Sequence, residues 1–167
     1  MNKRHFNYFL TNIPEFPFPV SICYFCYPIL IKIYMSEFWE SSFIEKQTMW
    51  GFEPAESAVL AKDIFVENKV KNILLPGIGY GRNAKIFLSN NIQVTGIEIS
   101  QTAINLARTE NKLDIPLYHG SVTDMPFDNI LYDGIFSYAL IHLLNKPERE
   151  QFIKNCYNQL NTNGYMI

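Results

Sequence analysis

Apolar runs of strand length and stretches of helical periodicity alternate along most of the chain. The predicted strands cover residues 70–75, 93–98, 116–120, 132–137 and 165–167. Between them, apolar side chains recur at helical spacing, which predicts helices over residues 82–89, 101–111 and 147–160. Ser100 is a favourable N-cap for the second helix, and Asn163 with Gly164 is expected to end the third. Strands separated by helices indicate an α/β fold with a parallel sheet and right-handed crossovers.

The region before residue 70 has a different pattern. Residues 36–69 have helical character, and a helix is expected to begin at residues 53–56, where a proline and acidic residues form its first turn. Residues 13–33 are apolar and aromatic, but prolines interrupt them, which argues against a membrane-spanning helix. Met35 opens a segment that reads as a protein start of its own. We therefore predict a non-native or disordered extension over residues 1–34, a helical segment over 35–69 and the main core over 70–167.

Composition narrows the class of protein. Of the 167 residues, 48% are hydrophobic and 18% charged, the formal net charge is −2, and no long basic run occurs. This balance is typical of a soluble globular domain and does not favour binding to nucleic acid or to a membrane. Three cysteines form no disulfide framework, and Cys23 with Cys26 has no second ligand pair at the spacing of a metal site. We expect no metal and a cytoplasmic location.

A glycine-rich segment over residues 75–83 follows the first predicted strand of the core and leads into a helix. Gly77, Gly79 and Gly81 allow positive φ angles and let a ligand approach the backbone without a Cβ in its path. The helix behind them offers free N–H groups and a partial positive charge. Ligands of parallel sheets bind beyond the carboxyl ends of the strands, where this loop is expected to lie. Three glycines also fit an ordinary tight turn, so the loop needs further support.

Two acidic residues supply that support. Glu98 ends the next predicted strand, where a carboxylate can accept hydrogen bonds from both ribose hydroxyls of an adenosine. After the third strand, Asp124 can accept from an adenine amino group while Met125 packs on the ring; the alternative is a turn that Asp124 caps before Pro126. The glycine spacing differs from the Gly-x-Gly-x-x-Gly pattern that binds a pyrophosphate, since position 82 is arginine.

Four successive segments resemble the motifs of class I S-adenosylmethionine-dependent methyltransferases. They are the glycine loop and residues 94–100, 121–127 and 133–144. The resemblance covers the chain from residue 50 to residue 167 and implies a Rossmann-like fold with helices on both faces. It implies S-adenosylmethionine as cofactor and methyl transfer to a small-molecule acceptor as the reaction. The positions that it assigns to cofactor binding are Gly77, Ile78, Gly79, Gly81, Arg82, Glu98, Ile99, Val122, Asp124, Met125, Ser137 and Tyr138.

Residues 38–51 resemble the front of the small-molecule branch that includes tellurite-resistance and thiopurine methyltransferases. In that branch a front aromatic residue closes over the cofactor, and Trp50 is the candidate here; the alternative is a core tryptophan. His142 is placed to act as a general base, but the apolar residues around it favour a structural histidine in a helix. We therefore assign no catalytic residue.

Members of this family continue through the fifth strand into further strands, whereas this chain stops at Ile167. We expect a sheet truncated after the start of strand five, with cofactor binding encoded and the activity of the chain in question. Two alternatives stay open, namely a non-catalytic nucleotide-binding remnant and an NAD(P)-binding oxidoreductase domain.

Overall fold

The computed structural model describes the backbone from residue 27 and the side chains from residue 34 onward. It contains two compact units, residues 1–35 and 36–167. Most of the extension predicted over residues 1–34, including Cys23 and Cys26, lies outside the described residues. The first described helix, α2, spans Tyr27–Lys46, so the boundary predicted after residue 34 falls inside a helix. The second unit carries all five strands of the sheet.

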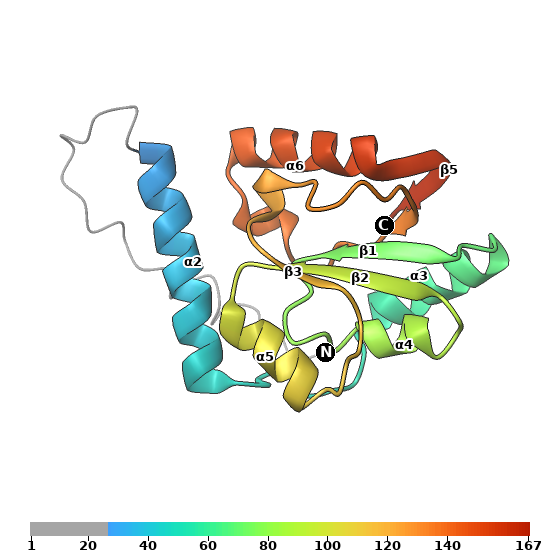
Figure 1. Ribbon diagram of the computed structural model, residues 1–167, viewed down its shortest axis with the longest axis horizontal. Coiled ribbons are helices and arrows are strands. Elements are labelled where there is room, and N and C mark those ends of the chain that lie inside the picture. Colours follow the sequence, from blue (N-terminus) through green and yellow to red (C-terminus); the bar gives the residue numbers. More distant parts are fainter. Residues whose placement is uncertain (1–26) are drawn as a thin grey trace. The chain divides into compact units, whose positions relative to one another are not determined.

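Five parallel strands form one sheet in the order β3-β2-β1-β4-β5 (Figure 1). The strands are β1 (Asn72–Pro76), β2 (Gln93–Glu98), β3 (Leu117–His119), β4 (Tyr132–Ile135) and β5 (Leu160–Met166). Each lies within two residues of a predicted strand except β5, which begins five residues early. The strand order reverses between β1 and β4, and ligands of open parallel sheets bind at such a switch point.

Helices cover both faces of the sheet, as predicted. One face carries α3 (Glu56–Glu67), α4 (Ala84–Leu88) and α5 (Gln101–Thr109), and the other carries α6 (Lys146–Gln159) (Figure 1). Because side chains alternate along a strand, Ile73 and Leu75 enter the core beneath α3 and α4, while Leu74 enters the core beneath α6. Two short 3-10 helices, η1 (Val122–Asp124) and η2 (Ile141–Leu143), follow β3 and β4. The parallel α/β fold is confirmed.

The predicted helix ends are partly right. Ser100 is the N-cap of α5, and its hydroxyl accepts a hydrogen bond from Ala103 N at 3.0 Å. Helix α3 begins at Glu56, two residues after the predicted first position Pro54, and the N–H of its N-cap Ala55 donates to Asn83 Oδ1 at 2.9 Å. A side chain from the loop after β1 therefore fixes where α3 starts, which its own sequence does not reveal.

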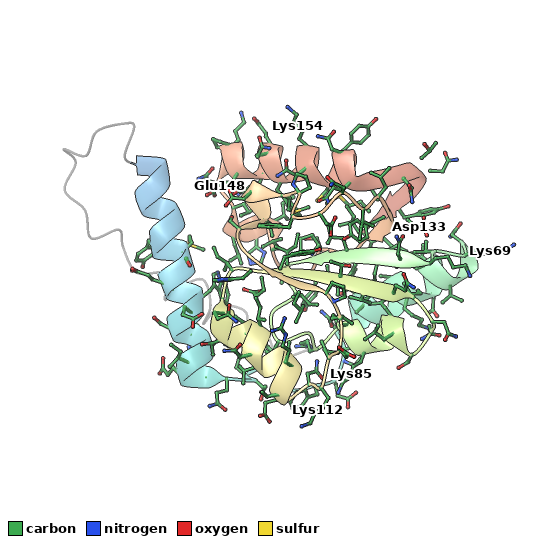
Figure 2. The ribbon with its side chains drawn as sticks, in the orientation of Figure 1. Lys69, Lys85, Lys112, Asp133, Glu148 and Lys154 are labelled. Carbon is green, nitrogen blue, oxygen red and sulfur yellow. The ribbon has the colours of Figure 1, made fainter. Side chains whose placement is uncertain are left out.

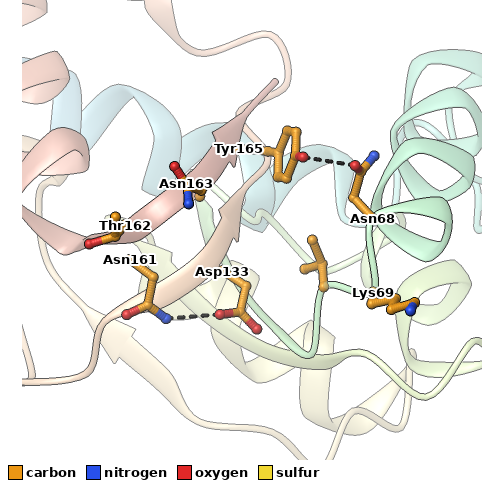
Figure 3. A pocket seen from close by; sticks show the side chains of 9 residues that line it. Asn68, Lys69, Asp133, Asn161, Thr162, Asn163 and Tyr165 are labelled. Atoms are coloured by element: carbon orange, nitrogen blue, oxygen red, sulfur yellow. Dashed lines mark hydrogen bonds between the residues drawn. The ribbon is translucent and has the colours of Figure 1, made fainter.

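Strand β5 departs from the prediction because it contains a wide bulge. Tyr132 pairs with Leu160 and Gly134 pairs with Tyr165, so residues 161–164 face the single residue Asp133. Asn161 Nδ2 donates to the Asp133 carboxylate at 2.8 Å, and this bond replaces the missing ladder contacts (Figure 3). The bulge lines an open cavity of about 170 Å³ at the amino ends of the strands, opposite the glycine loop. Helix α6 ends at Gln159, one residue before its predicted end, but the stop signal expected at residues 163–164 is wrong, since both residues lie inside β5.

The charged side chains of this unit are spread over its surface. Lys69, Lys112 and Lys154 lie on different sides of the unit and point outward (Figure 2). Among the described residues, no helix combines the length and apolar character needed to cross a membrane. The same part of the chain contains no cluster of three or more histidine, cysteine, aspartate or glutamate side chains arranged to hold a metal ion.

Candidate cofactor site

The predicted site residues meet at one edge of the sheet, where the parallel strands end. The glycine loop follows β1, Glu98 and Ile99 end β2, η1 and Met125 follow β3, and Ser137 and Tyr138 follow β4. Four segments that are distant in the sequence therefore reach a common edge. It includes the switch point between β1 and β4.

The glycines of the loop adopt positive φ angles, and two of them lie where a Cβ would be too close to a neighbouring side chain. Gly77, Gly79 and Gly81 have φ angles of +68°, +59° and +77°, which L residues with a side chain adopt at a cost. A Cβ placed on Gly81 would lie 2.2 Å from Leu113 Cδ1, and Leu113 is buried. A Cβ on Gly77 would lie 3.2 Å from the side chain of Leu140. The loop therefore depends on glycine at position 81 above all.

Hydrogen bonds join the glycine loop to β2 and to Asn111, which follows α5. Gly77 N and Ile78 N both donate to Ile97 O of β2, at 2.8 and 3.1 Å. The Ile78 side chain is buried against Gly96, so only the backbone of this predicted site residue can face a ligand. Asn111, which is fully buried, donates from Nδ2 to the carbonyl of Tyr80 at 3.0 Å. Sequence reasoning missed Asn111, because a single amide after a helix carries no motif.

Glu98 joins the glycine loop to the turn after β2. Its Oε2 accepts from Gly79 N at 2.8 Å, and its Oε1 accepts from Ile99 N at 2.9 Å and Ser100 N at 3.0 Å. A carboxylate offers about four acceptor positions, so one position on Oε2 stays available. Burial raises the pKa of Glu98, and the three N–H groups and the nearby His119 offset part of that rise. The ionised form is held chiefly by backbone dipoles.

The segment after β3 places its two apolar site residues in the core. Val122 and Met125 are buried beneath α6, whereas Asp124 is exposed. Ser121 caps η1, because its hydroxyl accepts a hydrogen bond from Thr123 N. Asn155 Nδ2 of α6 donates to the carbonyls of residues 122 and 123 and fixes the segment to the sheet.

The segment after β4 is the most exposed part of the edge. Ser137 N donates to Ile167 O at 2.8 Å, but the buried Ser137 Oγ has no hydrogen-bond partner among the described residues. Tyr138 is 44% exposed. Ala139 has a φ of +55°, and His142 is exposed within η2, whose three residues are all unburied. The interpretation of His142 as a structural histidine within an apolar helix is wrong.

The front segment, defined as residues 36–55, contacts the glycine loop through Tyr80. The hydroxyl of Tyr80 accepts from Trp50 N at 3.0 Å and donates to Gly51 O at 2.7 Å, and the Trp50 ring stacks on Tyr80 at 6.1 Å and 13°. Trp50 is 39% exposed, so the alternative of a core tryptophan is wrong. Arg82 Nε donates to Glu53 O at 3.1 Å, which directs this predicted cofactor residue toward the front segment.

A family model described as a methyltransferase domain matches residues 73–164, which is more than half of the chain. This chain belongs to the methyltransferase domain family. The match includes β1 to β4 and the site residues that follow them. The methyltransferase fold identifies the chain as a class I member, and S-adenosylmethionine is the cofactor of these methyltransferases. No curated protein matches the chain.

Solved structures share the fold of this chain at low sequence identity. The CcbJ methyltransferase from Streptomyces caelestis superposes with a TM-score of 0.63 at 17% identity, over 76% of this chain and 55% of that one. A structure from "Conversion of a Disulfide Bond into a Thioacetal Group during Echinomycin Biosynthesis" gives 0.65 at 18% identity, over 76% and 56%. S-adenosylmethionine-bound CalS10, an amino pentose methyltransferase from Micromonospora echinaspora, gives 0.57 at 14% identity, over 89% and 54%. The chain spans about half the length of the solved structures that it matches.

Proposed function

We propose that the carboxyl edge of the sheet binds S-adenosylmethionine and that the protein transfers its methyl group to a small molecule in the cytoplasm. The observation that carries this proposal is the bond from Gly79 N to the buried Glu98 carboxylate. It joins the two features that an adenosine cofactor requires, which are a glycine loop without side chains and an acidic strand end.

The residues present fit this cofactor. Glu98 keeps an acceptor position on Oε2 for a ribose hydroxyl, since its other bonds are to backbone N–H groups. A Cβ built on Gly79 would lie 3.7 Å from Phe43 Cζ, in van der Waals contact, so the glycine lets the front segment pack close to the loop backbone. Gly77, Gly79 and Gly81 would line the methionine part of the cofactor, and Asp124 with Val122 would lie by the adenine.

The end of β4 would face the acceptor. S-adenosylmethionine supplies an activated methyl group, so the protein mainly has to align a nucleophile with it. Ser137 Oγ, for which the described residues offer no hydrogen-bond partner, can orient a polar group of the acceptor. The exposed ring of Tyr138 beside it offers an apolar surface. The amino pentose that CalS10 methylates supports a small-molecule acceptor.

Calorimetric titration of the full chain with S-adenosylmethionine, S-adenosylhomocysteine and NAD tests the proposal. We expect binding of the first two and none of NAD. Tight NAD binding without a signal from S-adenosylmethionine would contradict it. Cofactor binding without methyl transfer to any of a panel of amines, thiols and amino sugars would favour the non-catalytic remnant.

A further inference from the structure

Glu40, on the part of α2 that belongs to the second unit, makes three hydrogen bonds to the start of α5. Its Oε2 accepts from Ser100 Oγ at 2.7 Å and from Thr102 N at 3.2 Å, and its Oε1 accepts from Thr102 Oγ1 at 2.5 Å. A carboxylate at a helix N-terminus is favoured by the free N–H groups and the helix dipole. Glu40 therefore satisfies donors of α5 from sixty residues away in the chain.

Ser100 lies between Glu40 and the carboxylate of Glu98. Its N–H donates to Glu98 Oε1 at 3.0 Å, while its Oγ donates to Glu40 and accepts from Ala103 N. The residue is fully buried, so neither bond can be exchanged for one to solvent. Both carboxylates are thus fixed to the same residue, one through its backbone and one through its side chain.

The same helix also reaches the other partner of Glu98. Phe43, one turn after Glu40, is buried, and its Cζ is the nearest atom to a Cβ built on Gly79. The N–H of Gly79 donates to Glu98 Oε2. Two backbone segments therefore hold the Glu98 carboxylate, and α2 contacts both: Glu40 contacts the start of α5, and Phe43 contacts the glycine loop at Gly79.

We propose that Glu40 is a positioning residue that couples docking of the front segment to cofactor binding, acting on Glu98 through Ser100. The inference rests on the proposed function, because it assumes that Glu98 holds the cofactor ribose. Hydrogen bonds from Thr102 and Ser100 outweigh the effect of burial and lower the pKa of Glu40, which keeps it ionised at neutral pH. Coupling of this kind is reciprocal, so bound cofactor stabilises the front segment as much as the docked segment strengthens cofactor binding.

Hydrogen exchange of the full chain, with and without S-adenosylhomocysteine, tests the coupling. In the unmodified chain, the ligand should slow exchange in residues 36–50 and in the glycine loop. In Glu40→Gln, protection of the glycine loop should persist while that of residues 36–50 is lost, and affinity should fall about five- to tenfold. The matched control is Glu37→Gln, which removes the same charge one turn earlier from an exposed side chain and should behave as the unmodified chain does.

The outcomes separate this inference from the proposed function. If S-adenosylhomocysteine does not bind the unmodified chain, the proposed function fails. If it binds and Glu40→Gln retains both the affinity and the ligand-induced protection of residues 36–50, the function stands and the coupling is wrong. Should Glu40→Gln fail to fold, Ser100→Ala removes the hydroxyl that bonds Glu40 and keeps the N–H that bonds Glu98, and an unchanged ligand-induced protection of residues 36–50 in that variant would equally overturn the coupling.

Discussion

The two halves of the carboxyl edge are built differently. At the ends of β1 and β2, backbone N–H groups of Gly77, Gly79 and Ser100 are all bonded, and Glu98 is buried among them. After β4, Tyr138 is 44% exposed and Ser137 Oγ has no partner within the described part of the chain. The proposed cofactor half is preformed and the proposed acceptor half is open, so single substitutions should have large effects in the first and small effects in the second.

Gly81→Ala should have the largest effect. The substitution forces a side chain into a φ of +77° and places a Cβ 2.2 Å from Leu113 Cδ1, for a combined loss of about 2–4 kcal/mol in the free energy of unfolding. Gly51→Ala is the matched control, since Gly51 has a φ of +66° but no atom within 4 Å of its Cβ position. It should cost about 1–2 kcal/mol from backbone strain alone. Urea unfolding compares the two, and equal losses would show that Leu113 yields freely.

Removing the Glu98 carboxylate should have the next largest effect. Glu98→Ala loses the charge-assisted hydrogen bond proposed to the cofactor ribose and should weaken cofactor binding by about 1–3 kcal/mol in calorimetric titration. Glu110→Ala, at an exposed position beyond α5, is the control and should leave affinity unchanged. An unchanged affinity in Glu98→Ala would remove the ribose assignment.

Acidification should weaken cofactor binding through Glu98. Burial raises its pKa above the usual 4.5, and protonation removes the negative charge and one acceptor position of the carboxylate, both of which strengthen a hydrogen bond from a ribose hydroxyl. Affinity should therefore fall as the pH drops toward that raised pKa, earlier than an ordinary glutamate would allow. The free energy of unfolding depends on pH in the opposite direction. Because the pKa of Glu98 is higher in the folded chain than in the unfolded chain, this residue stabilises the fold at a pH below its unfolded-state pKa. That contribution is lost as the pH rises through the folded-state pKa. Glu98→Gln should remove the pH dependence of binding in titrations across the acid range.

Local patterns predicted which segments meet at the carboxyl edge of the sheet, because these segments follow directly on predicted strands. The glycine loop and Glu98 lie at this edge, at the ends of β1 and β2, as their places after predicted strands indicate. The contact of Glu40 could not be predicted in this way, since its bond to Ser100 joins segments sixty residues apart and exists only after α2 has packed. The early start of β5 was missed for a similar reason, because the bulge in β5 depends on a bond from Asn161 to the distant Asp133. Both features depend on contacts between segments that are distant in the sequence, so the local sequence pattern does not predict them.

Tyr80→Phe should have a moderate effect that is confined to the front segment. The variant keeps the ring that stacks on Trp50 but loses the hydrogen bonds to Trp50 N and Gly51 O, at a cost of about 1 kcal/mol. Burial raises the pKa of Tyr80, so the hydroxyl carries its proton at neutral pH, where the two variants are compared. Tryptophan fluorescence should report a more exposed Trp50. An unchanged spectrum with unchanged stability would show that the ring alone holds the segment.

The smallest effect on folding is expected at Ser137, and a matched serine makes the comparison sharp. Ser100→Ala removes an N-cap that is bonded to Ala103 N and to Glu40, and should cost about 1–2 kcal/mol in the free energy of unfolding. Ser137→Ala removes a hydroxyl without a partner among the described residues, so stability should change by less than about 0.5 kcal/mol or rise slightly. Cofactor affinity should also stay the same, while methyl transfer falls if the hydroxyl orients the acceptor. A loss of stability in Ser137→Ala equal to that in Ser100→Ala would show that the end of β4 is as firmly bonded as the end of β2, and the contrast between the two halves of the site would disappear.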